Sequence, residues 1–379
     1  MKEGKIKDSC VVIAGQSPKG TSYNEIGNGM EFHQGKKAFG EIFIQPSNVW
    51  TTEITKIAEP SDILMSVRAP VGPTNITERR ICIGRGLAAI RCREGVLHKY
   101  VLYALKYIES KIVGNDGAVF NSINKTQIEE LPLPKVSLSE QQRIVELLDA
   151  EFAKIDAIKA NADQQLKDAK VLFQAALKDV LTPKEGWEEN KLGKCVDKLS
   201  DGSHNPPKGV KESEYIMLSS RNIGDDCIQD LDNVRFLTQT DFELENKRTL
   251  ARANDVVLTI VGTIGRCAVL KESDLPVTLQ RSVAIMSPKD YLDSRFMMYY
   301  LMSISNTLQK EAQGVAQKGI YLNQLKKIIV RYPSLIKQRE IVAYLDIISQ
   351  KVNSLQSNYN QTITLCNDLK QAFLKSIFE

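Results

Sequence analysis

The stretch LSEQQRIVELLD at residues 138–149 recurs as LIKQREIVAYLD at residues 335–346. Shifting the chain against itself by 197 residues makes half of these positions identical, among them Gln141 with Gln338 and Asp149 with Asp346. A repeat at a fixed offset is the signature of one structural unit that occurs more than once. The chain therefore consists of two related halves.

Each copy of the repeat opens a long amphipathic pattern. Residues recur at alternating steps of four and three, which is the heptad seam of a helix that pairs with another helix. The first seam comprises Ile144, Leu148, Glu151, Ile155, Ile158, Ala162, Gln165, Ala169, Leu172 and Ala176. The second comprises Ile341, Leu345, Ile348, Val352, Leu355, Tyr359, Thr362, Cys366, Leu369 and Phe373.

Each helix would be about 60 Å long at 1.5 Å per residue. Ala162 and Ala176 align with Tyr359 and Phe373, so we expect small side chains of one helix to face large ones of the other. The shared register favours pairing of the two helices within one chain. The alternative is that each helix only docks on its own globular part.

Upstream of the helices the offset drifts, so the early part of each half is variable and globular. Arg85 matches Arg281 at an offset of 196, and Asp62 matches Asp255 at 193. Strands are predicted at residues 62–67, 87–90, 255–260 and 283–286, and amphipathic helices at residues 98–112 and 292–311. The predicted class is mixed α/β, with segments 1–137, 138–182, 183–334 and 335–379.

Composition restricts the class of protein further. Hydrophobic residues make up 42% of the 379 and charged residues 25%, as in a folded soluble protein. No apolar run reaches the roughly 18 residues of a membrane helix, and the N-terminus has no apolar signal core. Seven scattered cysteines without a CxxC pair favour a reduced, cytoplasmic compartment. The net charge of +4 means that any nucleic-acid contact must come from local patches.

Sequence motifs for catalysis are missing. The chain has no GxxxxGK[ST] phosphate loop and no GxSxG, and its three histidines lack metal-ligand spacing. Asn205-Pro206-Pro207 resembles the Asn-Pro-Pro-aromatic tetrad of adenine methyltransferases, but Lys208 replaces the aromatic residue. A rigid proline turn is the better interpretation. We therefore predict no catalytic residue, no cofactor and no metal in this chain.

A set of motifs, in the same order in both halves, is similar to a known family. The first half contains 15–24, Phe32-His33-Gln34-Gly35, 66–72, Ile83-Gly84-Arg85-Gly86, 117–123, Leu131-Pro132-Leu133-Pro134 and Glu140-Gln141. The second contains Trp187-Glu188, Lys191-Leu192-Gly193, Asp201-Gly202-Ser203-His204, Gly262-Thr263-Ile264-Gly265 and Gln280-Arg281-Ser282. Over nearly its whole length, the chain resembles the specificity subunit of Type I restriction-modification systems.

The resemblance implies a function. The family's specificity subunit is not an enzyme: each of two target-recognition domains reads half of a bipartite site in double-stranded DNA. Two long antiparallel helices form an intramolecular coiled coil with pseudo-twofold symmetry and set the gap between half-sites. They also dock two modification subunits, which use S-adenosylmethionine, and restriction subunits that hydrolyse ATP join that core. Because the two globular parts differ in sequence, we expect an asymmetric target.

Candidate DNA-binding residues are side chains near loops that can bond to base edges or phosphates. In the first half they are Gln16, Lys19, Tyr23, Gln34, Lys36, Lys37, Arg68 and Arg85. In the second half they are Ser203, His204, Asn205, Lys208, Arg221, Asn222, Arg266 and Arg281.

Several candidates have an alternative role. Lys36 and Lys37 are either solvated surface or phosphate contacts. Arg85 and Arg281 align between the halves, which favours a structural or phosphate role, because base readers should differ between half-sites. Arg68 aligns with Val261, so its contact would belong to the first half-site alone. Gly117, Ser122 and Ile123 are expected to shape the turn into the helix.

Two other functions fit parts of the sequence. A protein-binding scaffold would use the paired helices without DNA, and steeply salt-dependent binding to a duplex would distinguish the two. A self-contained methyltransferase would need a cofactor site, which binding of S-adenosylmethionine by the isolated chain would reveal.

Overall fold

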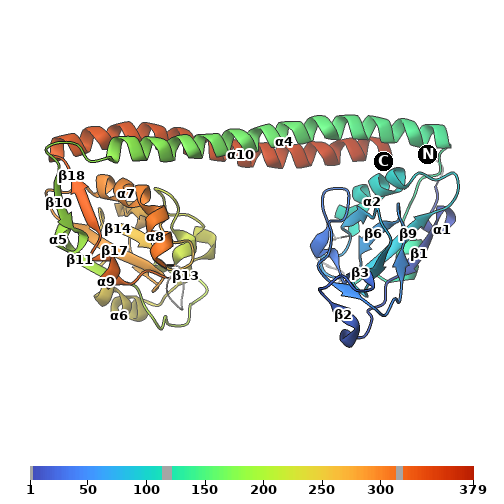
Figure 1. Ribbon diagram of the computed structural model, residues 1–379, viewed down its shortest axis with the longest axis horizontal. Helices are drawn as coiled ribbons and strands as arrows, with labels where there is room; N and C mark the ends of the chain where they lie inside the picture. The colour runs from blue at the N-terminus through green and yellow to red at the C-terminus, as the bar shows by residue number, and fades with distance from the viewer. Residues whose placement is uncertain (1–2, 113–121, 313–318) are drawn as a thin grey trace. The chain divides into compact units, whose positions relative to one another are not determined.

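The computed structural model describes residues 3–112, 122–312 and 319–379. The chain divides into two compact units, one of Met1–Ala162 with Asn360–Glu379 and one of Asp163–Tyr359. This division falls within both long helices, α4 (Leu138–Leu181) and α10 (Leu335–Phe378). Each unit therefore holds a globular part and one half of each long helix (Figure 1). The four predicted segments follow the chain instead, and their boundaries stay a prediction.

The globular part of unit 1 contains two sheets. An antiparallel sheet has the order β1-β9-β6-β7, and a mixed sheet has the order β2-β4-β3-β8-β5, in which β3 and β8 are parallel. The strands are β1 (Cys10–Ala14), β2 (Tyr23–Asn24), β3 (Met30–His33), β4 (Trp50–Thr51), β5 (Ile57–Ala58), β6 (Ile63–Ser66), β7 (Thr74–Ile76), β8 (Ile81–Ile83) and β9 (Leu87–Cys92). The helices are α1 (Ile6–Ser9), η1 (Gly20–Ser22), η2 (Lys36–Ala38), α2 (His98–Ile112) and α3 (Lys125–Glu129).

Unit 2 repeats this arrangement. Its antiparallel sheet has the order β11-β17-β14-β15, and a smaller sheet, β13-β12-β16, again contains a parallel pair, β12 with β16. The strands are β10 (Glu188–Lys191), β11 (Val196–Asp201), β12 (Ile216–Leu218), β13 (Arg235–Phe236), β14 (Val256–Thr259), β15 (Cys267–Val269), β16 (Val277–Leu279), β17 (Val283–Pro288) and β18 (Ile329–Tyr332). The helices are α5 (Leu192–Cys195), η3 (Ser220–Asn222), η4 (Leu231–Asn233), α6 (Gln239–Thr249), η5 (Glu272–Asp274), α7 (Ser294–Ser303), α8 (Ser305–Ala312) and α9 (Leu322–Leu325). The mixed α/β class and the internal repeat are confirmed.

One predicted helix is wrong in its continuity. Residues 292–311 form two helices, α7 and α8, which meet at Ile304. The Ser303 hydroxyl donates to the Tyr300 carbonyl at 2.6 Å, so this serine bonds to the backbone one turn earlier. Such bonds compete with regular helix geometry, which fits a break at this position.

The long helices run antiparallel where they meet within a unit. In unit 1, the Cys366 thiol lies 3.9 Å from the Ile155 carbonyl, whereas Lys370 lies over the ring of Phe152. As residue numbers rise along α10, the residues of α4 that they contact fall in number, so the two helices run in opposite directions. The core of unit 2 likewise contains Leu177 of α4 and Leu345 of α10. In both units a helix of the globular part, α2 or α7, lies between the sheet and the long helices (Figure 1). Both helix pairing and helix docking therefore occur.

The predicted seam is wrong from the middle of α4 onward. Ile158 and Leu172 are 54% and 67% exposed, whereas Leu166 and Phe173 are buried at 6% and 7%. A straight helix has 3.6 residues per turn, so a 3.5-residue repeat drifts by about 20° per heptad. The buried stripe of α4 has consequently moved by one residue along the helix.

One of the two expected matches of small and large seam residues, Ala176 with Phe373, is also corrected. Ala176 lies in unit 2 and Phe373 in unit 1, where Phe373 packs on the core. Aligning the repeats places these residues at the same distance from the start of each helix. Antiparallel pairing instead brings the start of one helix to the end of the other.

Candidate nucleic-acid interface

The candidate residues of unit 1 gather where two parallel strands end. Gln34 directly follows β3, and Arg85 follows β8 after one glycine. Gly84 donates its backbone N–H to the His33 carbonyl at 2.8 Å and so joins the two strand ends. The Ser17 hydroxyl donates to Gln34 Oε1 at 2.9 Å and accepts from the Arg85 N–H at 3.2 Å. Residues from three separate stretches of sequence thus meet at one edge.

A cleft of about 1060 Å³ opens beside these strand ends. The rings of Tyr23 and Phe32 stack in its wall with centroids 4.9 Å apart and 20° between their planes. Four predicted residues line it, namely Tyr23, Gln34, Lys37 and Arg85. Aromatic faces, amide groups and cations are the groups with which proteins bind nucleic acids.

A largely buried charge cluster adjoins the cleft, which His33 and Ser47 also line. Arg79 donates to both carboxylate oxygens of Glu31 at 2.6 and 2.7 Å, and the Ser47 N–H donates to Glu31 at 2.8 Å. Burial alone would raise the pKa of Glu31, but these bonds and one with His33 hold it at about 2. Burial lowers the pKa of His33, whose Nε2 lies 2.7 Å from Glu31 Oε1. At neutral pH the cluster therefore contains a charged Glu31 and a neutral His33.

The other unit 1 candidates are exposed but do not line the cleft. Gln16 bonds through its backbone to Ile83, the last residue of β8, and so shares the same edge. Lys19 and Lys36 lie on η1 and η2 or directly before them. Arg68 follows β6 in the other sheet and pairs with Ser122 through the backbone. Of the predicted turn residues, Gly117 lies outside the described residues.

Unit 2 presents the equivalent edge with different side chains. The Gln280 N–H donates to Leu218 of β12 at 2.8 Å, which joins the ends of the parallel strands β12 and β16 as in unit 1. Arg281 follows at the position of Arg85 and donates its N–H to the Ser203 carbonyl at 2.9 Å. The side chain of Arg221, on η3, is exposed. The alignment of Arg85 with Arg281 thus corresponds to equivalent positions in the two folds.

The loop after β11 carries further candidates. Asp201 accepts hydrogen bonds from Arg248 and lies 2.9 Å from His204 Nε2, so it orients both side chains. Arg235 donates to the carbonyls of Pro206 and Pro207 and fixes the turn that also holds Asn205 and Lys208. This geometry agrees with a proline turn at Asn205-Pro206-Pro207.

Two candidates are buried in this structure, and their contact with DNA stays a prediction. Ser203 is 7% exposed and lies beside Gln280 in a backbone pairing. Asn222 is 1% exposed, and its amide bonds to Ser219 and to the Asp230 carbonyl. Sequence alone marked both as loop polar residues, but the tight turns they stabilise keep their side chains from the surface.

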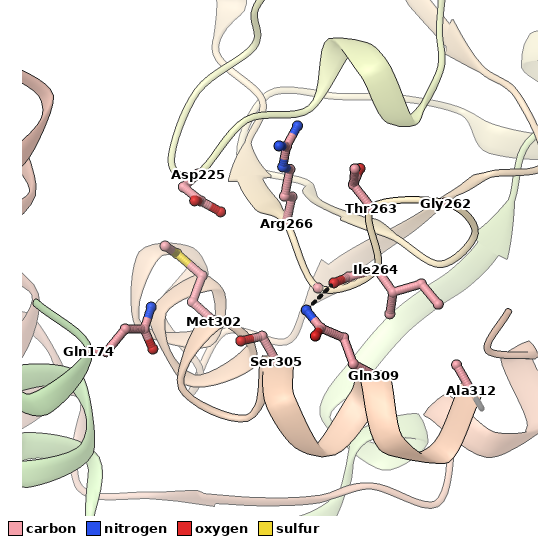
Figure 2. Close-up of a pocket in the computed structure, with 11 residues that line it drawn as sticks. Gln174, Asp225, Gly262, Thr263, Ile264, Arg266, Met302, Ser305, Gln309 and Ala312 are labelled. Carbon is pink, nitrogen blue, oxygen red and sulfur yellow. Dashed lines mark hydrogen bonds between the residues drawn. The ribbon is translucent and has the colours of Figure 1, made fainter. Parts of the chain in front are cut away.

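Arg266 lies at a different place from the other candidates of unit 2. It lines a pocket of about 490 Å³ with Asp225, Gln174 of α4 and residues of α8 (Figure 2). Gln309 of α8 closes one side by donating to the Ile264 carbonyl at 3.0 Å. This pocket faces the long helix and not the ends of the parallel strands.

Two features escaped the sequence comparison. Arg248 lies on α6, which has no counterpart among the described residues of unit 1, so aligning the repeats does not single it out. A short hairpin also recurs at an offset of 184, with GEIFIQ at 40–45 and GDDCIQ at 224–229. Each copy has the same N–H to carbonyl bond, Gly40 to Phe43 and Gly224 to Cys227. Because this offset of 184 differs from the offset of 197 near the helices, aligning the halves at 197 does not reveal the match.

Within the described ranges, no three His, Cys, Asp or Glu side chains are grouped as a metal site would require. None of the helices described there combines the length and hydrophobicity needed to cross a lipid bilayer.

Comparison with known proteins decides the family. The model of the Type I restriction modification DNA specificity domain matches twice, at residues 3–168 and 185–365. This chain belongs to that family.

Relatives of this specificity subunit agree with the assignment. The MjaX type I restriction enzyme specificity subunit of Methanocaldococcus jannaschii is 43% identical over 162 residues, 42% of this chain and 37% of that protein. The match therefore spans little more than a third of that relative's length. The EcoBI specificity subunit of Escherichia coli is 27% identical over 351 residues, 84% of this chain and 73% of that protein.

A solved structure shows the same fold for the specificity subunit. It comes from work on complex assembly and conformational transition of the type I R-M system. Its TM-score is 0.71 at 19% identity, and the match covers 100% of this chain and 97% of that one. The chain is thus a Type I specificity subunit with two target-recognition domains, the globular parts of units 1 and 2.

Proposed function

We propose that this chain is the non-catalytic subunit that gives a Type I restriction-modification complex its DNA sequence specificity. Each recognition domain reads one half of an asymmetric, bipartite site in double-stranded DNA. The paired helices set the gap between the halves and dock two modification subunits.

One observation carries this proposal. Both domains have the same edge, at the ends of a parallel strand pair, but each presents different side chains there. Both domains place candidates where a parallel strand pair ends, and Arg85 corresponds to Arg281. Around that shared arginine, unit 1 presents Tyr23, Gln34 and Lys37, whereas unit 2 presents Arg221. A shared cation suits phosphate, which is the same in every sequence, and divergent side chains suit bases. Two half-sites of different sequence follow.

The helix surfaces support two copies of one partner. Exposed apolar residues recur at the 197-residue offset as Leu147 with Tyr344, Ile158 with Leu355, and Leu172 with Leu369. Apolar side chains that stay exposed in both halves indicate a contact surface that occurs twice. Modification subunits are the partners that we assign to it.

The chemistry of the complex would reside in those partners. S-adenosylmethionine would bind the modification subunits, and ATP would bind the restriction subunits. We place the complex in the cytoplasm, with the chromosomal DNA.

Sequencing the methylated bases of the native genome, with and without this gene, tests the proposal. Loss of a two-part, asymmetric adenine-methylation motif on deletion is the expected result, and it gives both half-sites at once. An unchanged methylome, in cells shown to contain the assembled complex, would overturn it. Duplex binding without salt dependence by the purified chain would instead favour a protein-binding scaffold.

A further inference from the structure

The repeated hairpin carries the candidate DNA-binding segment on one side and contacts the long helices on the other. In unit 1, η2 with Lys36 and Lys37 lies directly before this hairpin, and Gln45 directly after its turn lines the cleft. Asn75, 1% exposed, fixes the turn by accepting from the Gly40 N–H and donating to the Gly40 carbonyl, both at 2.9 Å. The hairpin is therefore joined to β7 and to the cleft.

Glu41, at the tip of this hairpin, reaches the long helices of unit 1. Its carboxylate accepts a hydrogen bond of 2.7 Å from Lys370 of α10. Lys370 also pairs with Asp156 of α4, and its ammonium lies 5.3 Å from the ring centroid of Phe152. The lysine side chain is only 20% exposed, and these three groups hold it in one place. In addition, Lys106 of α2 donates to the Glu41 carbonyl at 3.1 Å.

The equivalent hairpin of unit 2 makes the same kind of contact with different residues. Asp226 accepts from Arg295 of α7 at 2.8 Å and from Ser349 of α10 at 3.1 Å. Arg295 in turn donates to Asp346 of α10 at 2.7 Å. Asp226 has a φ of +64°, a conformation that few residues other than glycine adopt. Such a backbone persists only where surrounding contacts determine it. Candidate Arg221 lies directly before this hairpin, on η3.

We propose that Glu41 with Lys370, and Asp226 with Arg295, are positioning contacts that fix each DNA-reading segment on the helices and so restrict the gap that the subunit accepts. This inference rests on the proposed function. Helix length sets the gap only if each reading segment is held on its helix. In both units an acidic residue of the hairpin provides that connection, although the two sequences differ.

The test uses the complex of this chain with its modification subunits. Its substrates are duplexes that carry the half-sites from the methylome at the native gap, or at a gap one base pair longer or shorter. We compare the methylation rate at the native gap with the rate at an altered gap. Lys370→Met should lower the native-to-altered ratio roughly fivefold, the effect of a partly exposed ion pair. Lys370→Arg, which retains the charge, should keep the wild-type ratio. Lys375→Met removes an exposed lysine of the same helix, paired only at 3.4 Å with Glu379, and is the matched control.

A purely structural role would give a different result. It would lower methylation at all gaps alike, or leave the ratio as in Lys375→Met, and either result overturns the inference. Should Lys370→Met fail to fold, Glu41→Gln removes the same pair from its more exposed side, at 60% exposure. A wild-type complex without gap preference would contradict the proposed function, and the positioning inference with it.

Discussion

Gln141 and Gln338 explain at the residue scale why the repeat is so uniform at the start of each helix. Gln141 accepts from the Leu97 N–H and donates to the carbonyls of Gly95 and Val136. Gln338 accepts from the Asp293 N–H at 2.8 Å and donates to the carbonyls of Tyr291 and Pro333 at 2.9 Å. One buried amide in each half thus provides hydrogen-bond partners for backbone groups in two places. These are the loop before the shorter helix, α2 or α7, and the turn into the long helix, α4 or α10. No other side chain combines these donors and acceptors at this length.

Gln338→Ala should therefore destabilise unit 2 by about 1–3 kcal/mol, because buried backbone groups lose their partners. The free energy of unfolding from denaturant titration measures this. Gln350→Ala, at an exposed position of the same helix, is the control. Equal stability of the two variants would show that Gln338 is not a structural anchor.

At the candidate edge, Arg85 and Gln34 should behave differently. Arg85→Ala should weaken binding to all duplexes alike and reduce the salt slope by about 1, as expected for a phosphate contact. Gln34→Ala should alter base preference in the first half-site only. Binding of the complex to a panel of duplexes at several salt concentrations separates these effects. A changed base preference in Arg85→Ala would assign it to base reading instead.

His33 should make unit 1 sensitive to acid. Burial lowers its pKa in the folded protein, so below the ordinary value of about 6.5 the unfolded chain takes up a proton that the folded chain does not. The stability contribution is present above that value and is lost as pH falls. His33→Gln should flatten the decline of the free energy of unfolding between about pH 7 and 5.5, by at most about 1.4 kcal/mol per pH unit. Burial also lowers the pKa of His98, which adds a slope of the same sign in both proteins. Parallel curves for wild type and variant would contradict this.

At the scale of elements, the long helices combine two apolar surfaces. One is buried against the partner helix and the globular part, and the other is the exposed series that recurs at 197 residues. A heptad pattern read from sequence merges them, since both consist of apolar residues at helical spacing. The adjacent residues Leu172 and Phe173 lie on different surfaces for this reason.

Phe173→Ala should cost about 3–5 kcal/mol of stability, the usual range for a buried phenylalanine. Leu172→Ser should stay within about 0.5 kcal/mol, because this side chain is mostly exposed. Denaturant unfolding of both variants provides the comparison. A larger loss of stability in Leu172→Ser than in Phe173→Ala would instead support the heptad seam predicted from the sequence.

At the scale of the whole molecule, the repeat predicts two equivalent partner sites within one chain. Leu172 and Leu369 are equivalent in the two copies, and each lies on the half-helix of a different unit. A single change should thus affect only one of the two sites.

Leu172→Ser or Leu369→Ser should each reduce the bound modification subunits from two to one at limiting partner concentration, and the double variant should bind none. Native mass spectrometry of the assembled complex reports this stoichiometry. Lys167→Ser, on the exposed side of α4, is the control. Retention of two subunits in the double variant would exclude this surface.

Sequence by itself determined the repeat, the two long helices, the mixed α/β class and the correspondence of Arg85 with Arg281. These depend on local periodicity and on equal spacing between copies, which a chain displays without folding. Only the tertiary structure decided which side chains meet. In the fold, Ser203 and Asn222 are buried, and Arg266 lines a pocket away from the other candidates of unit 2. Arg248 is brought to Asp201, beside the candidate loop after β11. It also joined Glu41 to Lys370 and Asp226 to Arg295, pairs separated by 329 and 69 residues. Such contacts depend on how strands pair and how a helix drifts from the heptad repeat, and neither is encoded in a short stretch of sequence.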